Sequence, residues 1–246
     1  MTNDETVVAP RLVTAQRTHR GLVREANEDS VHTGANVLAL ADGMGGHAAG
    51  EVASALMIAA LASLEHPGEG DLLSRLEQAV LEGNAAIADR ARQSSETEGM
   101  GTTLSALLFD GTRFGLAHVG DSRVYRLRGG QLSQLTHDDT FVQALVDAGH
   151  ITAEQARTHP RRSLIMRALT GAVVAPTLTL EQAEIGDRFL LCSDGLSDVV
   201  GAEHIERTMA GARSVEECAA QLIELALDGG GPDNVTVVVA DLVAAI

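Results

Sequence analysis

The chain has 246 residues and carries 34 acidic against 18 basic side chains, which gives a formal net charge of −16. This excess of negative charge argues against nucleic acids and anionic membrane surfaces as main partners. Aromatic residues make up only 2% of the chain, so the core has to be aliphatic and a base-stacking platform for single-stranded nucleic acid is excluded.

Every one of the 18 basic residues is arginine. A Walker phosphate loop and a protein kinase each need a lysine against phosphate, and Schiff-base enzymes need a lysine nucleophile, so all three classes are excluded. Two cysteines, Cys192 and Cys218, cannot build a disulfide framework. The sequence has no secretory leader and no run of eighteen apolar residues, which predicts a cytoplasmic protein that is not in a membrane.

Apolar patterning and turn residues predict the elements in chain order after a flexible N-terminus at residues 1–10. We expect strands at residues 12–18, 36–41, 102–109, 114–119, 124–127, 131–136, 177–182, 188–192 and 235–243. We expect helices at residues 50–64, 71–93, 141–148, 153–158 and 214–228, with Asp71 as an N-cap. Asp110-Gly111 and Gly129-Gly130 predict tight turns in two hairpins.

Helical segments that alternate with antiparallel hairpins favour an α+β fold over a repeated βαβ unit. The chain contains no internal repeat and no Pro- or Ser-rich linker. We therefore expect residues 11–246 to form a single domain.

A candidate metal ligand follows the apolar run 37–41, which reads as a buried strand. There the sequence continues Asp42-Gly43-Met44-Gly45-Gly46-His47, so the strand delivers a carboxylate into a glycine-rich bend. A carboxylate beside a bare peptide carbonyl is a hard-oxygen site suited to Mg²⁺ or Mn²⁺. Asp-Gly is also a common turn pair, and alone this segment indicates no more than a turn.

Three further aspartates, Asp121, Asp194 and Asp233, also stand at the edges of apolar strands. If these edges converge, the four carboxylates cannot all stay ionised without cations. Two divalent ions that share one carboxylate would compensate their charge. Such a pair of ions activates a bridging water for in-line attack on phosphorus.

A polar segment after the first strand, Arg24-Glu25-Ala26-Asn27-Glu28-Asp29, supplies residues that suit such a site. The planar fork of Arg24 suits bidentate binding of a phosphate. Glu28 and Asp29 could hold metal-bound waters. The same residues are also typical of an ordinary solvated loop.

In order along the chain, these motifs resemble the metal-dependent type 2C Ser/Thr protein phosphatases in their compact bacterial form. The resemblance rests on Arg24-x-x-Asn27-Glu28-Asp29, residues 42–47, Gly101-Thr102-Thr103, residues 118–123, residues 193–196 and Asp233-Asn234-Val235-Thr236. It implies a four-layer α-β-β-α sandwich, in which two antiparallel sheets are flanked by helical pairs, over residues 11–246 as one catalytic domain.

The resemblance also implies a role for each residue at two Mn²⁺ or Mg²⁺ ions and a weaker third. Asp42 would bridge the two ions, and the Gly43 carbonyl would bind one of them. Asp194 and Asp233 would complete the other ion, and Asp121 with Asp194 would hold the third. Glu28 and Asp29 would act through water, Arg24 would bind the substrate phosphate, and His47 would protonate the leaving seryl or threonyl oxygen as a general acid.

Other histidines and arginines have simpler interpretations. His118 is expected to be packed or hydrogen-bonded in the core, and Cys192 to be a small buried apolar residue. The segment from about Asp138 to Thr170 corresponds to the family's flap beside the active site. Arg161 and Arg162 there are either phosphopeptide contacts or solvated charges, and solvation is the simpler account.

Competing enzyme classes fail on particular residues. A cysteine phosphatase needs Cys-x5-Arg, but the residues six positions after the cysteines are Asp198 and Glu224. The H-E-x-x-H and G-x-S-x-G motifs are absent, and the stretch from Asp194 lacks the glycine and glutamate of a calcium loop.

The sequence therefore predicts a hydrolase that dephosphorylates phosphoserine and phosphothreonine in proteins without a phosphoenzyme, through a metal-activated water. Expected partners are phosphorylated proteins, including a cognate Ser/Thr kinase or its substrates, and the protein is expected to be a monomer. The alternative is a catalytically silent phosphoprotein-binding regulator with the same fold, whose signature would be the loss of a metal aspartate. A phosphatase of a partner-switching system is a further alternative, although that branch usually carries sensor domains.

Overall fold

Two antiparallel sheets form the centre of the structure, a computed structural model that describes residues 10–45, 49–66, 68–94, 97 and 99–245. Across the first sheet the order is β1 (Pro10–His19), β11 (Val235–Ala244), β10 (Arg188–Cys192), β7 (Arg123–Arg128) and β8 (Gln131–Gln134). Across the second sheet it is β2 (Asp29–Thr33), β3 (Val37–Met44), β5 (Leu104–Phe109), β6 (Arg113–Val119) and β9 (Thr177–Gln182), with β4 (Gly101–Thr102) paired to the end of β3.

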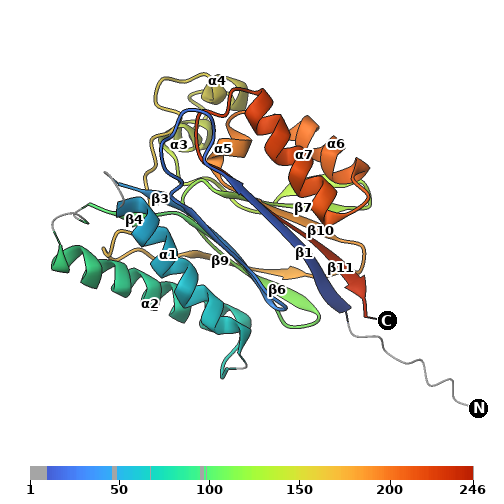
Figure 1. The fold of residues 1–246 in the computed structure, drawn as a ribbon, viewed down its shortest axis with the longest axis horizontal. Coiled ribbons are helices and arrows are strands. Elements are labelled where there is room, and N and C mark those ends of the chain that lie inside the picture. The colour runs from blue at the N-terminus through green and yellow to red at the C-terminus, as the bar shows by residue number, and fades with distance from the viewer. Residues whose placement is uncertain (1–9, 46–48, 67, 95–96, 98, 246) are drawn as a thin grey trace, which may run out of the picture.

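Helices cover the outer face of each sheet (Figure 1). The second sheet is covered by α1 (Ala49–Ala62), the 3-10 turn η1 (Ser63–Glu65) and α2 (Leu72–Gln93). The first sheet is covered by α5 (Asp194–Ser197), α6 (Ala202–Gly211) and α7 (Val215–Asp228). Two short helices, α3 (Phe141–Asp147) and α4 (Ala153–Arg157), lie beside α5 at the end of the sandwich away from the last residues of β11. The predicted α+β four-layer sandwich is confirmed.

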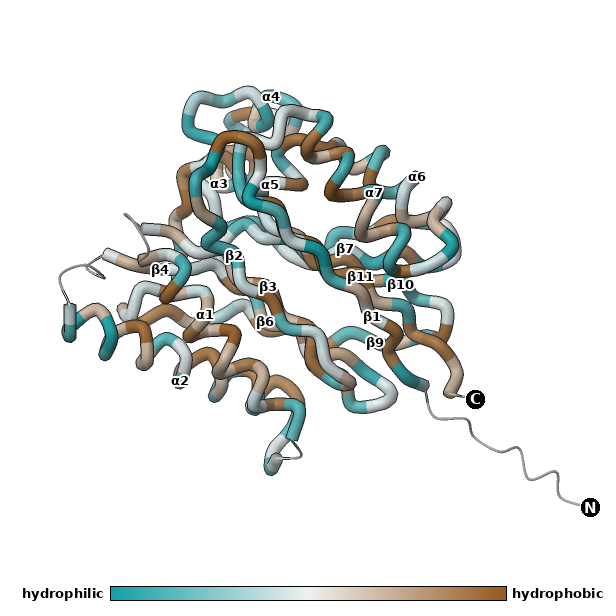
Figure 2. The backbone as a smooth tube through the Cα atoms, in the orientation of Figure 1, coloured by the Kyte–Doolittle hydropathy of each residue, from teal (hydrophilic) through white to brown (hydrophobic). Residues whose placement is uncertain are grey.

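Three apolar layers hold the four structural layers together, and strand periodicity assigns residues to them. Along β3, Val37, Ala39 and Ala41 pack toward α1 and α2, whereas Leu38 and Leu40 pack between the two sheets. A strand covered on both faces needs apolar side chains at every position. This explains why the central strands read as continuous apolar runs, as the hydropathy colouring shows (Figure 2).

Three of the four phenylalanines join the sheets in the middle layer. The ring centroids of Phe109 and Phe114 are 4.7 Å apart, and those of Phe114 and Phe189 are 4.6 Å apart. Phe109 and Phe114 belong to the second sheet and Phe189 to the first. In a chain with so few aromatic residues, this cluster supplies the largest side chains of the inter-sheet contact.

Most predicted elements are confirmed, together with their turns and caps. The Asp71 side chain accepts hydrogen bonds of 3.0 Å from the backbone N–H groups of Leu73 and Ser74, as an N-cap does. Gly129 and Gly130, with φ of 57° and 80°, form the turn between β7 and β8, where glycine adopts successive positive φ angles without strain.

Three elements were not predicted from the sequence: β2, α5 and α6. Strand β2 has five partly buried residues, three of them Asp, Ser or Thr, and forms because its backbone pairs with the edge of β3. Helix α5 has only four residues, too few for a periodic signal. Helix α6 did carry a signal, since Ile205 and Met209 are four residues apart and both are buried.

The predicted bend at Asp42-Gly43 is wrong. Strand β3 continues through Met44, with Asp42 opposite Asp29 of β2 and Gly43 opposite Thr102 of β4. Pairing on both sides keeps the backbone extended past the Asp-Gly pair. The chain leaves this geometry only at Gly45, whose φ is 146°.

Two sequence expectations fall wholly or mostly on residues that the structure does not describe. Residues 1–9 of the predicted flexible terminus lie outside the described ranges, and residue 10 already belongs to β1. His47 lies outside them as well. Among the helices that are described, none combines the length and apolarity that a membrane crossing requires.

Candidate functional site

The backbone of Asp42 is fixed by hydrogen bonds to Thr102 and Thr103. Its N–H donates to Thr103 Oγ1 at 3.0 Å, and its carbonyl accepts from Thr103 N at 2.9 Å and Thr102 Oγ1 at 2.9 Å. Gly43 has no room for a side chain, because a Cβ there would lie 2.2 Å from the Gly50 carbonyl oxygen. The glycine at this position is therefore required by close packing of α1 on β3, not by a turn.

Asp194 is the first residue of α5, which follows strand β10 of the first sheet. The preceding residue, Ser193, is fully buried and joins the two sheets. Its hydroxyl donates to Asp29 Oδ2 at 2.9 Å and accepts from Thr236 N at 3.0 Å. Ser193 thereby ties Asp29 of β2 to the start of α5.

Asp233 lies just before β11 and holds the loop that carries Arg24. Arg24 Nη2 donates to Asp233 Oδ2 at 2.7 Å. Next to Asp233, the buried Asn234 accepts from Glu28 N at 2.8 Å and donates from Nδ2 to the carbonyls of Arg20 at 3.0 Å and Ala26 at 2.8 Å. One asparagine side chain thus fastens both ends of the loop between β1 and β2.

These segments enclose a cavity of about 310 Å³ at one end of the sandwich. Six of the predicted site residues line it: Arg24, Glu28, Asp42, Gly43, Asp194 and Asp233. Asp29 does not line this cavity, but its carboxylate accepts a hydrogen bond from Ser193, which precedes Asp194. Asp121 lines a neighbouring cavity of about 250 Å³ beneath α3 and α4. Three of the four strand-edge aspartates, Asp42, Asp194 and Asp233, therefore line one cavity, and the fourth, Asp121, lines the neighbouring one.

The electrostatics of the cavity follow from burying several like charges together. Burial, followed by the charges of Asp29 and Asp194, raises the pKa of Asp42 well above its usual value. The pKa of Asp194 is raised well above its usual value by burial and by Asp121 and Asp198. Burial raises the pKa of Asp29 to about 6 and that of Asp121 to about 7. Each ionised carboxylate in this group therefore costs free energy unless a cation compensates it.

The donor set fits a hard divalent cation. Carboxylates and a peptide carbonyl are the ligands that Mg²⁺ and Mn²⁺ take. Two carboxylate oxygens, Asp29 Oδ1 and Asp121 Oδ1, are buried without a hydrogen-bond donor within the described part of the chain. Among the described residues, no three His, Cys, Asp or Glu side chains stand close enough together to cage an ion as they are placed. The geometry supports a cluster of candidate ligands, not a finished coordination sphere.

His118 and Cys192, which the sequence assigned to the core, are both buried. His118 is 1% exposed, with Nδ1 3.0 Å from Ser105 Oγ and Nε2 3.1 Å from the His137 carbonyl, and burial lowers its pKa. Cys192 is buried, and burial raises its pKa to about 12, so it offers no thiolate nucleophile. Both match the expectation of core residues.

Sequence reasoning gave no role to Ser193 or Asn234, and for Arg162 it favoured a solvated charge over a phosphopeptide contact. Ser193 and Asn234 stand directly beside predicted metal aspartates, which is the signal that could have marked them as supports. Arg162 lines the same cavity as Asp42 and Asp194, although solvation had been the simpler account of its charge. No local pattern separates it from Arg161.

The sequence profile of the protein phosphatase 2C family matches residues 16–226. The chain belongs to the protein phosphatase 2C family. The matched span contains Arg24, Asp42, Asp121 and Asp194, and it ends seven residues before Asp233.

Relatives within this phosphatase 2C family agree in sequence and fold. The serine/threonine protein phosphatase PstP of Mycobacterium tuberculosis is 64% identical over 231 residues, which cover 93% of this chain and 45% of PstP. The serine/threonine phosphatase stp of Listeria welshimeri is 36% identical, and the match covers 92% of this chain and 94% of that protein. The chain thus spans less than half the length of PstP and most of the length of stp.

Solved structures of phosphatases match the fold of this chain over most of its length. The crystal structure of the M. tuberculosis phosphatase PstP/Ppp has a TM-score of 0.92 and 63% identity and covers 95% of this chain and 99% of that one. The catalytic domain of PstP in complex with two manganese ions has a TM-score of 0.90 and 61% identity, with the same coverage.

Proposed function

We propose that this chain is a metal-dependent phosphatase that hydrolyses phosphoserine and phosphothreonine in proteins. The observation that carries the proposal is the convergence of Asp42, Asp194 and Asp233 with Arg24 on one cavity of about 310 Å³. Acidic ligands for cations and an arginine for an anion are the two halves of a phosphate-ester site. Membership of the protein phosphatase 2C family supports the same reaction.

Asp42 and the Gly43 carbonyl, together with Asp194 and Asp233, would hold two Mn²⁺ or Mg²⁺ ions. Asp121 would join Asp194 at a weaker third. The PstP catalytic domain in complex with two manganese ions supports this number for the main site. When bound, such ions neutralise the phosphate and lower the pKa of a water that attacks phosphorus.

The chain's own contribution begins with Arg24. Its hydrogen bond to Asp233 raises its pKa, so the guanidinium stays charged at every working pH. The side chain is more than half exposed on the rim of the cavity, where a phosphate can reach it. We expect Arg24 to exchange Asp233 for two phosphate oxygens, because the planar fork fits both acceptors in the same way.

Glu28 and Asp29 are the other two acidic residues that we assign to this site. The backbone N–H of Glu28 donates to Asn234, and the Asp29 carboxylate accepts from Ser193. The short segment that carries both carboxylates is therefore fixed at two points. Their raised pKa values show that either group gains by sharing its charge with a cation or a proton. We assign them to ordering water beside the ions.

The substrates we propose are phosphorylated proteins, including a cognate Ser/Thr kinase or its targets. We further propose that residues 11–246 act as one catalytic domain and that the protein works as a monomer in the cytoplasm. General acid catalysis by His47 stays a prediction from the sequence, because that residue lies outside the described ranges.

The test is phosphate release from a phosphoserine peptide with Mn²⁺, with Mg²⁺ and with EDTA. We expect turnover only with a divalent ion, and we expect Asp42→Asn and Asp233→Asn each to abolish most of it. Calorimetric titration with Mn²⁺ should show weaker or fewer sites in both variants. Asp89→Asn is the matched control, because Asp89 lies exposed on α2 and pairs with Arg92 on the helix surface.

Full activity in EDTA, or in either site variant, would refute the metal-dependent mechanism. Binding of the phosphopeptide with no turnover under any metal would instead favour the catalytically silent regulator. Turnover by wild type and Asp89→Asn at equal rates is needed before either result is interpreted.

A further inference from the structure

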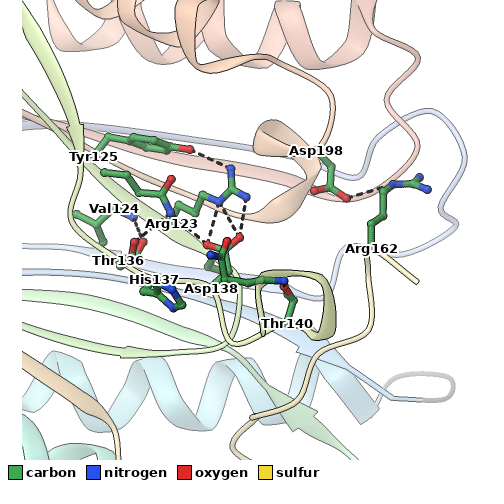
Figure 3. Close-up of polar contacts among 12 residues, drawn as sticks. Arg123, Val124, Tyr125, Thr136, His137, Asp138, Thr140, Arg162 and Asp198 are labelled. Carbon is green, nitrogen blue, oxygen red and sulfur yellow. Dashed lines mark hydrogen bonds and ion pairs between the residues drawn. The ribbon is translucent and has the colours of Figure 1, made fainter. Parts of the chain in front are cut away.

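Arg162 is held more loosely by the protein than Arg123 and Arg24, two other arginines that line these cavities. Arg123 donates to both carboxylate oxygens of Asp138, at 3.0 Å from Nε and 2.6 Å from Nη2, and to Tyr125 Oη at 3.2 Å (Figure 3). Arg24 donates to Asp233 at 2.7 Å. Arg162, by contrast, approaches Asp198 only to 3.9 Å, and within the described residues its guanidinium donates no hydrogen bond.

The backbone beneath Arg162 is nevertheless well positioned. Its N–H donates to the His159 carbonyl at 3.1 Å, and the Leu164 carbonyl accepts from Phe141 N at 2.9 Å. The neighbouring Arg161 stacks over the Phe141 ring with 4.8 Å between its guanidinium carbon and the ring centroid. The turn is therefore fastened to α3 on both sides of Arg162, while the Arg162 side chain extends toward Asp198.

Arg162 and Asp198 stand where two cavities meet. Both residues line the cavity of the candidate metal site, and both also line the neighbouring cavity beneath α3 and α4. Asp198 belongs to the turn that ends α5, since its N–H donates to the Asp194 carbonyl at 2.8 Å. The ion pair thus links the segment after α4 to the helix that begins with a predicted metal ligand.

Only two cations, Arg24 and Arg162, line the metal-site cavity within the described chain. Arg24 is the one assigned to the reacting phosphate. Arg162 keeps five N–H donors on a side chain that is 52% exposed. A second cation in this position suits a second anionic group on the same substrate.

We propose that Arg162 is a specificity-determining residue that binds an anionic group of the substrate peptide, a carboxylate or a second phosphate, in place of Asp198. This inference rests on the proposed function. Asp198 acts as an internal competitor: substrates without the extra anion leave Arg162 on Asp198, whereas acidic or doubly phosphorylated segments exchange with it. Arg161 has no such role, because it lies over the Phe141 ring and lines neither of the two cavities.

The test compares three phosphoserine peptides that differ only in the residues flanking the phosphoserine. One carries glutamine, one carries glutamate, and one carries a phosphonate analogue of phosphoserine that cannot be hydrolysed. For wild type we expect kcat/KM to be roughly two- to fivefold higher on an anionic peptide than on the glutamine peptide, the range of an exposed ion pair. The glutamate and phosphonate arms show which anion supplies the contact.

Arg162→Ala should remove this preference, mainly through KM, and Arg162→Lys should keep part of it. Arg161→Ala is the matched control and should keep the preference, and Asp198→Asn should enlarge it because the competing carboxylate is gone. The Mn²⁺ concentration for half-maximal activity should be the same in wild type and Arg162→Ala. A melting curve for each variant verifies that it is folded.

Three results would overturn the inference: no preference in wild type, an unchanged preference in folded Arg162→Ala and Arg162→Lys, or an equal loss in Arg161→Ala. Each of these leaves the proposed function intact if the glutamine peptide is still hydrolysed with Mn²⁺. Absence of turnover on all three peptides would instead refute the proposed function.

Discussion

Replacing Asn234 with alanine tests the support of the loop that carries Arg24. The substitution removes three hydrogen bonds: one accepted from Glu28 N at 2.8 Å and two donated to the carbonyls of Arg20 and Ala26, at 3.0 Å and 2.8 Å. Asn234 is only 6% exposed, so water cannot fully replace these partners. The loop then keeps the Arg24–Asp233 contact and the 2.7 Å bond from Leu22 N to the Gly231 carbonyl.

The magnitude follows from the number of bonds. At a net contribution of roughly 1 kcal/mol per hydrogen bond, we expect Asn234→Ala to lower the free energy of unfolding by about 2–3 kcal/mol. For a chain of this length that corresponds to a fall in Tm of roughly 5–10 °C. Because the loop carries the proposed phosphate ligand, KM for a phosphopeptide should also rise, with a smaller change in kcat.

The assay is urea unfolding in EDTA, which excludes any restabilisation by metal ions, together with steady-state kinetics in excess Mn²⁺. Asn234→Asp keeps the acceptor for Glu28 N, loses both donated bonds and adds a buried negative charge beside Asp233, so it should be destabilised at least as much as Asn234→Ala. Asn36→Ala is the control, since the Asn36 contacts described in the structure run through its backbone. If Asn234→Ala has the same stability and KM as the wild type, Asn234 does not support the loop that carries Arg24.

Three more outcomes are expected. Phe114→Ala should cost about 3–5 kcal/mol in urea unfolding, because the fully buried ring packs on Phe109 and Phe189 between the sheets, and a loss under 1 kcal/mol would contradict that packing. Burial raises the pKa of Asp29 to about 6 and that of Asp121 to about 7, so the folded state favours their protonated forms. The free energy of unfolding of the metal-free protein should therefore fall as pH rises through these values. Mn²⁺ should therefore raise Tm more at pH 8 than at pH 5, and an equal rise at both would argue against the charge cluster. His47→Ala should slow phosphoserine peptides more than p-nitrophenyl phosphate, whose leaving group needs no proton, and equal slowing would exclude the acid role.

The elements that the sequence predicted are those whose signal is local. The Asp71 cap, the Asp110-Gly111 and Gly129-Gly130 turns and the apolar strand runs each depend on residues within a few positions of one another. Strand β2 escaped prediction because its polar residues become a strand only when the edge of β3 offers backbone partners. The same pairing turned the expected Asp42-Gly43 bend into extended strand.

For the site, the amino-acid sequence shows which residue types are available: four strand-edge aspartates, a loop with an arginine, and no lysine. These residue types suit a hard divalent cation and a phosphate, and the resemblance of the ordered motifs to the type 2C phosphatases implies that they bind them. Which of these residues share a cavity, and which side chains hold them there, depends on how the chain packs in three dimensions. Ser193 reaches Asp29 across 164 positions, Asn234 reaches Glu28 across 206, and Arg162 rather than Arg161 faces Asp198. Contacts at such separations depend on how two sheets stack, and no local pattern along the chain encodes that.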